Sequence, residues 1–145
     1  MKHGEIRWYK FMRPDKKRPV LILTRDFVLE YLGEVTVVPI TSTVRNIPSE
    51  VFLSKADGMP RDCAVNCDHL QTVSKGKIGY LITSLPPAKM VAVGRAIRFA
   101  LDVSDSNGQP RRAVGLASLA ADAERYLLHL IKREEFNVNE WVQSW

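Results

Sequence analysis

A run of cations that leads into an apolar run is the first stretch whose residue types could do chemistry. Lys16, Lys17 and Arg18 precede Pro19, and residues 20–23 have no polar member. The apolar run predicts a strand buried on both faces, and Pro19, which cannot donate to a ladder, is expected at its first residue. Arg18 is then expected where the core ends and solvent begins, and a guanidinium there can bind a phosphate or carboxylate through two hydrogen bonds. The alternative is that the cations only keep the end of the sheet solvated.

The histidines and cysteines form no catalytic or metal-binding pattern. No two of His3, His69 and His129 are spaced for acid–base work, so each is interpreted as a surface or packing residue. Cys63 and Cys67 sit within or beside one predicted strand, and two thiols are too few for a structural zinc site. We expect reduced packing cysteines, no metal site and no cofactor.

The charge of the chain points to an anionic partner. The 145 residues carry a net charge of +5, with a pI of about 9.4. Residues 1–103 hold 16 Lys/Arg and 10 Asp/Glu, a net +6, whereas residues 104–145 hold 5 Lys/Arg and 6 Asp/Glu, a net −1. The positive charge therefore belongs to the first part of the chain.

The composition fits one ordinary globular domain. An apolar share of 46% and a charged share of 26% are typical of such a domain, and 145 residues are enough for a core. No apolar run has the length of a membrane span, and the N-terminus lacks the apolar segment of a signal peptide. A cytoplasmic location without membrane contact is expected.

The elements that must position Arg18 are short strands followed by a helix. Alternation, β-branched residues and turn signals predict strands at residues 5–11, 19–24, 35–40, 50–53, 63–67, 70–73 and 78–82, with a helical turn or two at 25–32. The short connections favour antiparallel pairing. Two prolines then open an amphipathic helix that runs to about residue 103. The pattern predicts an α+β fold.

A second unit is expected after this helix. Residues 104–115 are predicted to be a polar linker, and residues 116–145 a helical extension with a tail that contains Trp141 and Trp145. Tryptophans in a tail usually have a surface on which to dock.

Several segments of residues 3–103 together resemble the MazF/PemK/Kid family of toxin endoribonucleases. In chain order they are Gly4-Glu5-Ile6-x-Trp8, Arg18-Pro19-Val20-Leu21-Ile22-Leu23-Thr24, Val37-Val38-Pro39-Ile40-Thr41-Ser42, Val65-Asn66-Cys67-Asp68-x-Leu70-Gln71-Thr72-Val73 and the helix with Leu85-Pro86, Lys89-Met90, Val93 and Ala96-Ile97. The resemblance implies a small, mostly antiparallel SH3-like β-barrel of the CcdB/PemK type with a C-terminal helix, assembled as a homodimer. It also implies metal-free cleavage of single-stranded RNA (mRNA, tRNA or rRNA) and a cognate antitoxin that blocks the RNA groove.

The resemblance also implies roles for individual residues. Arg18 matches the family's catalytic arginine, Thr41 matches its catalytic threonine, and Ser42 is the neighbouring position of the same site. Asp68 is the candidate if an acidic base is used. Asn66 stands where some members have an arginine, so the alternative for Asp68 is a carboxylate that caps a turn.

Further residues are candidates for contacts with RNA. A rim that follows the phosphates is expected from Lys16, Lys17, Arg45, Lys75 and Lys77, with Gln71 as a further RNA-binding residue. An ordinary solvated face is the alternative for each cation. Trp8 and Tyr9 could stack on bases, although alternating aromatics in a strand more often belong to the core.

Two questions about function stay open in the sequence. The acidic, tryptophan-containing extension either restrains activity by lying over an RNA groove, or it only extends the dimer interface or packs on the barrel. A non-catalytic relative, either RNA-binding or gyrase-poisoning like CcdB, is the alternative to a nuclease. The presence of both Arg18 and Thr41 favours the nuclease.

Overall fold

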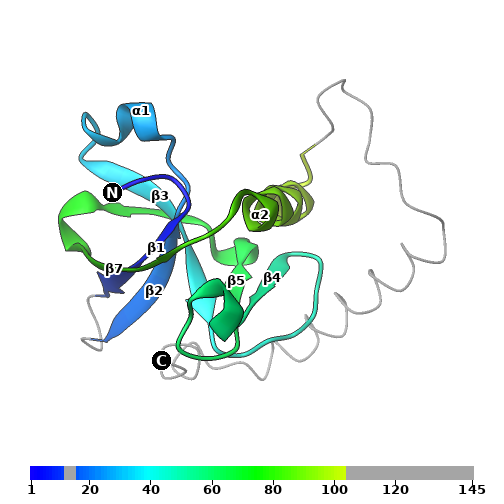
Figure 1. The fold of residues 1–145 in the computed structure, drawn as a ribbon. Helices are drawn as coiled ribbons and strands as arrows, with labels where there is room; N and C mark the ends of the chain where they lie inside the picture. The colour runs from blue at the N-terminus through cyan, green and yellow to red at the C-terminus, as the bar shows by residue number, and fades with distance from the viewer. Residues whose placement is uncertain (12–15, 104–145) are drawn as a thin grey trace.

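A computed structural model describes residues 1–11 and 16–103 of the chain (Figure 1). In this part the strands are β1 (Glu5–Lys10), β2 (Lys17–Ile22), β3 (Glu34–Thr41), β4 (Glu50–Leu53), β5 (Cys63–Asn66), β6 (Gln71–Ser74) and β7 (Ile78–Ser84). The helices are α1 (Asp26–Leu29) and α2 (Pro87–Leu101), and the 3₁₀ turns are η1 (Lys55–Asp57), η2 (Cys67–His69) and η3 (Lys75–Lys77). The predicted linker at residues 104–115 and the predicted extension at residues 116–145 lie outside the described residues.

The strands form one antiparallel sheet. Their order is β4–β5–β3–β2–β1–β7, and β6 pairs with the first half of β3. The predicted antiparallel sheet with a following helix is therefore confirmed, but the sheet is open where a barrel would be closed. Among the described residues no ladder joins β6 to β7, because η3 turns the chain between them.

The sheet buries side chains on both of its faces. Alternate residues of β2 and β3 enter two clusters, because successive side chains of a strand point to opposite faces. Leu21 and Val38 pack in a larger cluster that includes Val93 of α2, a helix that packs against η2 and β4. Val20 and Val37 pack in a smaller cluster on the other face. The prediction that residues 20–23 form a strand buried on both sides is confirmed for the part within β2.

Both prolines of the central strands sit further inside their strands than the sequence predicts. Pro19 is the third residue of β2, and Pro39 is followed by two more residues of β3. At Pro19 the strand pairs with β1 through Trp8, whereas its ladder with β3 begins only at Val20. Pro19 therefore sits where β2 has one neighbouring strand, a position that tolerates a missing N–H donor.

Helix α2 begins and ends close to its expected limits. Its N-cap is Pro86, a second proline occupies its first turn, and it ends at Asp102 in the left-handed region with φ of 53°. No helix in residues 1–11 and 16–103 is both long and apolar enough to cross a membrane.

The turn that ends η1 gives a prediction for stability. Gly58 has φ of +91°, and a Cβ added there would lie 2.4 Å from Oγ1 of Thr83. Gly58→Ala is expected to lower the free energy of unfolding by roughly 1–3 kcal/mol, because the backbone conformation and the contact are both unfavourable for alanine. Chemical denaturation measures this effect. The matched control is Gly33→Ala, since no atom lies within 4 Å of the added Cβ and φ is not positive there. Equal stability of the two variants would contradict the argument.

Candidate functional site

Arg18 lies in the interior of the fold rather than at its mouth. It is the second residue of β2 and shares a face with Val20 and Ile22 of the smaller core cluster. Its exposed fraction is 1%, and its Nε and Nη2 atoms are both buried. The expectation that Arg18 stands where solvent begins is therefore wrong.

Two aromatic residues, Tyr9 of β1 and Phe11 just after β1, lie near Arg18. Tyr9 stands directly opposite Arg18 in the ladder, and the Phe11 ring lies 5.7 Å from the Arg18 Cζ atom. The two rings meet edge to face with their centroids 4.7 Å apart. Burial lowers the pKa of Arg18, because an apolar environment disfavours its charged form. The guanidinium remains charged near neutral pH, and a charge held away from water interacts more strongly with an anion.

Thr41 is the last residue of β3, the strand that neighbours β2. The β2–β3 ladder ends with the pair of Val20 and Pro39, and Arg18 and Thr41 each lie two residues beyond that pair, with their side chains on the same face. Thr41 is fully buried and pairs with Ala64 of β5. Its Oγ1 accepts a hydrogen bond of 3.1 Å from the Thr43 amide, so its own O–H can point elsewhere. Ser42 follows directly and is half-buried.

Asp68 belongs to a separate hydrogen-bonded group. Its Oδ2 accepts a bond of 2.7 Å from Oγ of Ser49, which is fully buried. Its amide donates to Oδ1 of Asn66, the N-cap of η2, at 3.2 Å. The cap of this turn is therefore the Asn66 side chain and not the Asp68 carboxylate, which Ser49 holds instead. Arginine at position 66 would remove this amide oxygen, so the departure at Asn66 and the environment of Asp68 are linked.

Arg45 contacts a buried carboxylate beside this group. Its amide donates to Oε2 of Glu50 at 3.0 Å, and its Nη1 lies 3.5 Å from Oε1 of Glu50. Burial raises the pKa of Glu50 and the nearby Asp68 charge adds to the rise, while the hydrogen bonds and charge of Arg45 oppose it. The guanidinium of Arg45 therefore forms an ion pair with the Glu50 carboxylate at the start of β4.

The other candidates for RNA binding lie at different places on the sheet. Lys16 and Lys17 are at the end of β2 that Arg18 occupies, and Lys17 is exposed. Gln71 pairs with Val37 and its Nε2 donates weakly to the His69 carbonyl at 3.5 Å. Gln71 therefore lies along β3, away from the end of β2 that carries Lys16 and Lys17.

The two lysines of η3, Lys75 and Lys77, lie next to different parts of the sheet. The Lys75 amide bonds to Gly33, next to the end of β3 that lies roughly 20–25 Å along the strand from Thr41. Its Nζ donates to the Leu29 carbonyl. Lys77 is exposed and precedes Ile78, which pairs with Tyr9 of β1. Lys77 thus lies nearer to the Arg18 end of the sheet.

The two thiols are packing residues, as predicted. Cys63 and Cys67 are free and buried in the larger core cluster. Burial raises the pKa of each to about 12, and the carboxylates of Asp62 and Asp57 beside Cys63 contribute to its rise. In residues 1–11 and 16–103 no three His, Cys, Asp or Glu side chains gather to hold a metal ion.

Comparison with known proteins gives one family model and several relatives that agree with each other. Residues 2–101 match the model of the family described as PemK-like, MazF-like toxin of type II toxin–antitoxin system. Endoribonuclease MazF3 of Mycobacterium tuberculosis is 46% identical over 86 residues, which are 57% of this chain and 84% of that protein. Probable endoribonuclease MazF2 of the same species is 37% identical over 99 residues, 68% of this chain and 95% of that one.

A solved structure agrees with these matches. The Mycobacterium tuberculosis toxin MazF-mt6 superimposes with a TM-score of 0.64 at 38% identity, covering 69% of this chain and 98% of that one. The shared region includes Arg18, Thr41, Ser42 and Asp68, since all four lie within residues 2–101.

Proposed function

The chain belongs to the PemK-like, MazF-like toxin family of type II toxin–antitoxin systems, and from this membership we propose that it is a sequence-specific endoribonuclease that cleaves single-stranded RNA. Two curated relatives that carry the name endoribonuclease support the proposal. The observation that supports it in this chain is a buried arginine, Arg18, and a buried hydroxyl, Thr41, each two residues beyond the last pair of the β2–β3 ladder and on the same face.

The reaction proposed needs no metal ion, because the substrate supplies its own nucleophile. The 2′-hydroxyl attacks the adjacent phosphorus, so a bond from the 2′-oxygen to phosphorus forms while the bond from phosphorus to the 5′-oxygen breaks. The 2′-hydroxyl loses its proton, and the departing 5′-oxygen gains one. The products are a 2′,3′-cyclic phosphate and a 5′-hydroxyl end.

Arg18 and Thr41 stabilise the charge that develops on the phosphoryl oxygens. A desolvated guanidinium is suited to this task, because electrostatic stabilisation is the largest protein contribution to phosphoryl transfer. The Thr41 O–H donates to the same oxygens, and Ser42 adds a second hydroxyl at the entrance. Arginine holds its proton far above neutral pH, so Arg18 is assigned no proton transfer. Asp68 is assigned a holding role, because its carboxylate accepts from Ser49.

The partners of the proposed enzyme follow from the same membership. The substrate is mRNA, tRNA or rRNA in single-stranded form, and a cognate antitoxin neutralises the toxin in the cytoplasm. The active form is a homodimer. Cleavage of these RNAs arrests translation and growth.

The decisive experiment is incubation of the full chain with a long RNA in excess EDTA. We expect discrete cuts, with cyclic phosphate ends that resist ligation until a 2′,3′-phosphatase opens and removes them. Cleavage that disappears in EDTA would contradict the metal-free reaction. Intact RNA in both EDTA and Mg²⁺ would reject the nuclease and favour the non-catalytic alternative, which a gyrase inhibition assay and an RNA-binding assay then distinguish.

A further inference from the structure

The ladder between β1 and β7 contains an irregularity opposite Trp8. Arg7 pairs with Leu81 and Tyr9 pairs with Ile78, so two residues of β7, Gly79 and Tyr80, oppose the single residue Trp8. This is a β-bulge, which leaves part of the backbone outside the ladder and re-aims the side chains beside it.

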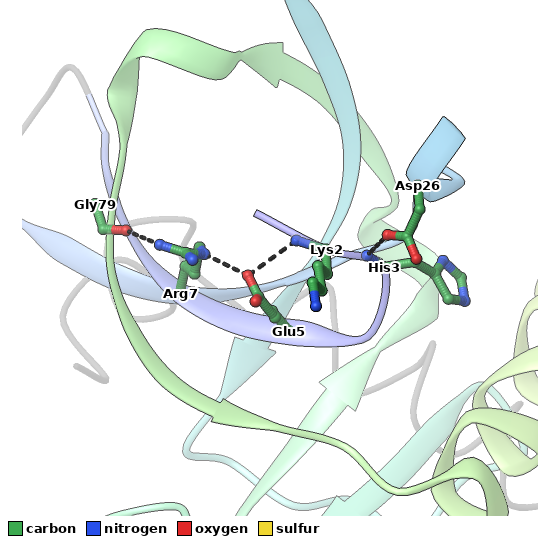
Figure 2. Close-up of polar contacts among 6 residues, drawn as sticks. All are labelled: Lys2, His3, Glu5, Arg7, Asp26 and Gly79. Atoms are coloured by element: carbon green, nitrogen blue, oxygen red, sulfur yellow. Dashed lines mark hydrogen bonds and ion pairs between the residues drawn. The ribbon is translucent and has the colours of Figure 1, made fainter. Parts of the chain in front are cut away.

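A chain of polar contacts holds the bulge in place (Figure 2). Nη1 of Arg7 donates to the Gly79 carbonyl at 3.1 Å, and Nε of Arg7 donates to Oε2 of Glu5 at 2.6 Å. The Lys2 amide donates to the same Glu5 oxygen at 3.0 Å. Burial alone would raise the pKa of Glu5, but the contacts of Arg7 and Lys2 outweigh it and the pKa lies below its usual range. The buried, ionised carboxylate of Glu5 thus holds Arg7 in position, and Arg7 in turn holds the bulge through the Gly79 carbonyl.

The bulge leaves two aromatic side chains accessible. Tyr80 is 80% exposed, and Trp8 is half-buried. Gly79 has no side chain to cover Trp8, and a Cβ there would lie 3.8 Å from the Trp8 Cβ. Large exposed aromatics on a rigid strand are the usual platform on which unpaired bases stack.

Two lysines stand opposite each other beside these aromatics. Lys10 and Lys17 form the last pair of the β1–β2 ladder, two positions along from the pair of Trp8 with Pro19, and both lysines are exposed. Because strand residues alternate between faces, Lys10 shares a face with Trp8. Lys17 is also the residue immediately before Arg18, so the lysine pair lies at the same end of β2, with its side chains on the opposite face of the strand from Arg18.

We propose that Trp8, Lys10, Lys17 and Tyr80 form a subsite for single-stranded RNA, in which a base stacks on the aromatics and the adjoining phosphates bind the lysine pair. This inference rests on the proposed function, since it assigns a surface that holds the RNA strand at the end of β2 where Arg18 lies. Glu5 and Arg7 are positioning residues, because they hold the bulge and do not touch the RNA. The alternation of π-surface and cations fits a nucleic acid strand, which presents bases and phosphates in turn.

The test measures binding of the full chain to a short, fluorescein-labelled 2′-O-methyl RNA of random sequence, which cannot be cleaved. Tyr80→Ala is expected to weaken binding roughly tenfold, whereas Tyr80→Phe binds like the wild type because it keeps the ring. The matched control is Tyr31→Ala, since Tyr31 is 81% exposed and lies elsewhere, after α1. Thermal unfolding of each variant checks that the fold is intact.

The lysine pair has its own readout. The variant that combines Lys10→Gln and Lys17→Gln is expected to lower the slope of log K against log salt concentration by about 0.7 per lysine. Lys55→Gln, at an exposed lysine of η1, is the control and leaves the slope unchanged. Thermal unfolding of the double variant and of Lys55→Gln checks that both proteins are folded.

Each outcome supports or overturns the subsite. Equal RNA affinity of Tyr80→Ala and Tyr31→Ala overturns it, as does an unchanged salt slope for the lysine variant. Loss of self-association in Tyr80→Ala at unchanged RNA affinity also overturns it and assigns the surface to contact between copies of the chain. Failure of the proposed function is distinct, because it appears as intact long RNA with the wild-type chain whatever the order of affinities among these variants.

Discussion

Replacing Arg18 with methionine is expected to lower the rate of RNA cleavage by about 10²- to 10³-fold while the protein stays folded. The guanidinium is the one group of the proposed site that carries a full positive charge to the phosphoryl oxygens. Methionine fills a similar buried volume without a charge. Thermal unfolding of Arg18→Met checks that the variant is folded. Single-turnover rates on an RNA with a mapped cut site measure the loss.

Two further substitutions sharpen this prediction. Arg18→Lys is expected to recover only part of the rate, because an ammonium lacks the planar fork that holds two oxygens at once. Asp68→Asn is the control, because its amide oxygen can still accept the hydrogen bond from Ser49. Its rate should fall much less than that of Arg18→Met. A folded Arg18→Met that cleaves as fast as the wild type would contradict the role of Arg18, and a loss in Asp68→Asn equal to that of Arg18→Met would make Asp68 the missing base.

Thr41→Val is expected to lower kcat by about 10²-fold with little change in KM. Valine keeps the shape of the fully buried threonine but removes the hydroxyl that donates to the phosphoryl oxygens. The Thr43 amide also loses its acceptor, but Thr43 is exposed and water can replace the bond. Thr41→Ser, which keeps the hydroxyl, is the matched control and should retain most of the activity. A rise in KM at constant kcat would instead mean that Thr41 only helps to bind the substrate.

The burial of Arg18 gives the site its character. An arginine with an exposed fraction of 1% has lost most of its hydration, which costs free energy in the absence of substrate. The Phe11 ring lies 5.7 Å from the Arg18 Cζ atom, and Tyr9 stands opposite Arg18 in the β1–β2 ladder. A charge kept this way is suited to stabilise an anion that approaches it, because solvent screens it weakly.

Much of the fold follows from local patterns in the sequence. The run at residues 20–23 and the β-branched residues of β3 predict strands buried on both faces, and the strand at Glu50–Leu53 has the bounds expected from its turn signals. Helix α2 follows from its prolines and its spacing of apolar residues. Such elements can be predicted because the spacing of apolar side chains along the chain indicates a helix or a strand, and the tertiary contacts of this fold agree with that local preference.

Features that depend on how strands meet could not be predicted. Tyr9 stands opposite Arg18 on the neighbouring strand, and a strand pattern does not say which residue of another strand stands opposite. The ion pair of Arg45 with Glu50 is likewise a loop contact. The bulge at Gly79 and Tyr80 had one signal, a glycine inside a predicted strand, which often marks such an irregularity.

A double-mutant cycle tests most directly whether Arg18 and Thr41 act on the same phosphoryl group. The single-turnover rates of the wild type, Arg18→Met, Thr41→Val and the combined variant are compared on one RNA substrate. If the two residues work as a unit, the combined variant loses much less than the product of the two single losses, because either substitution already disables the shared stabilisation. Losses that multiply would show that the two side chains act independently and would contradict the site proposed for this protein.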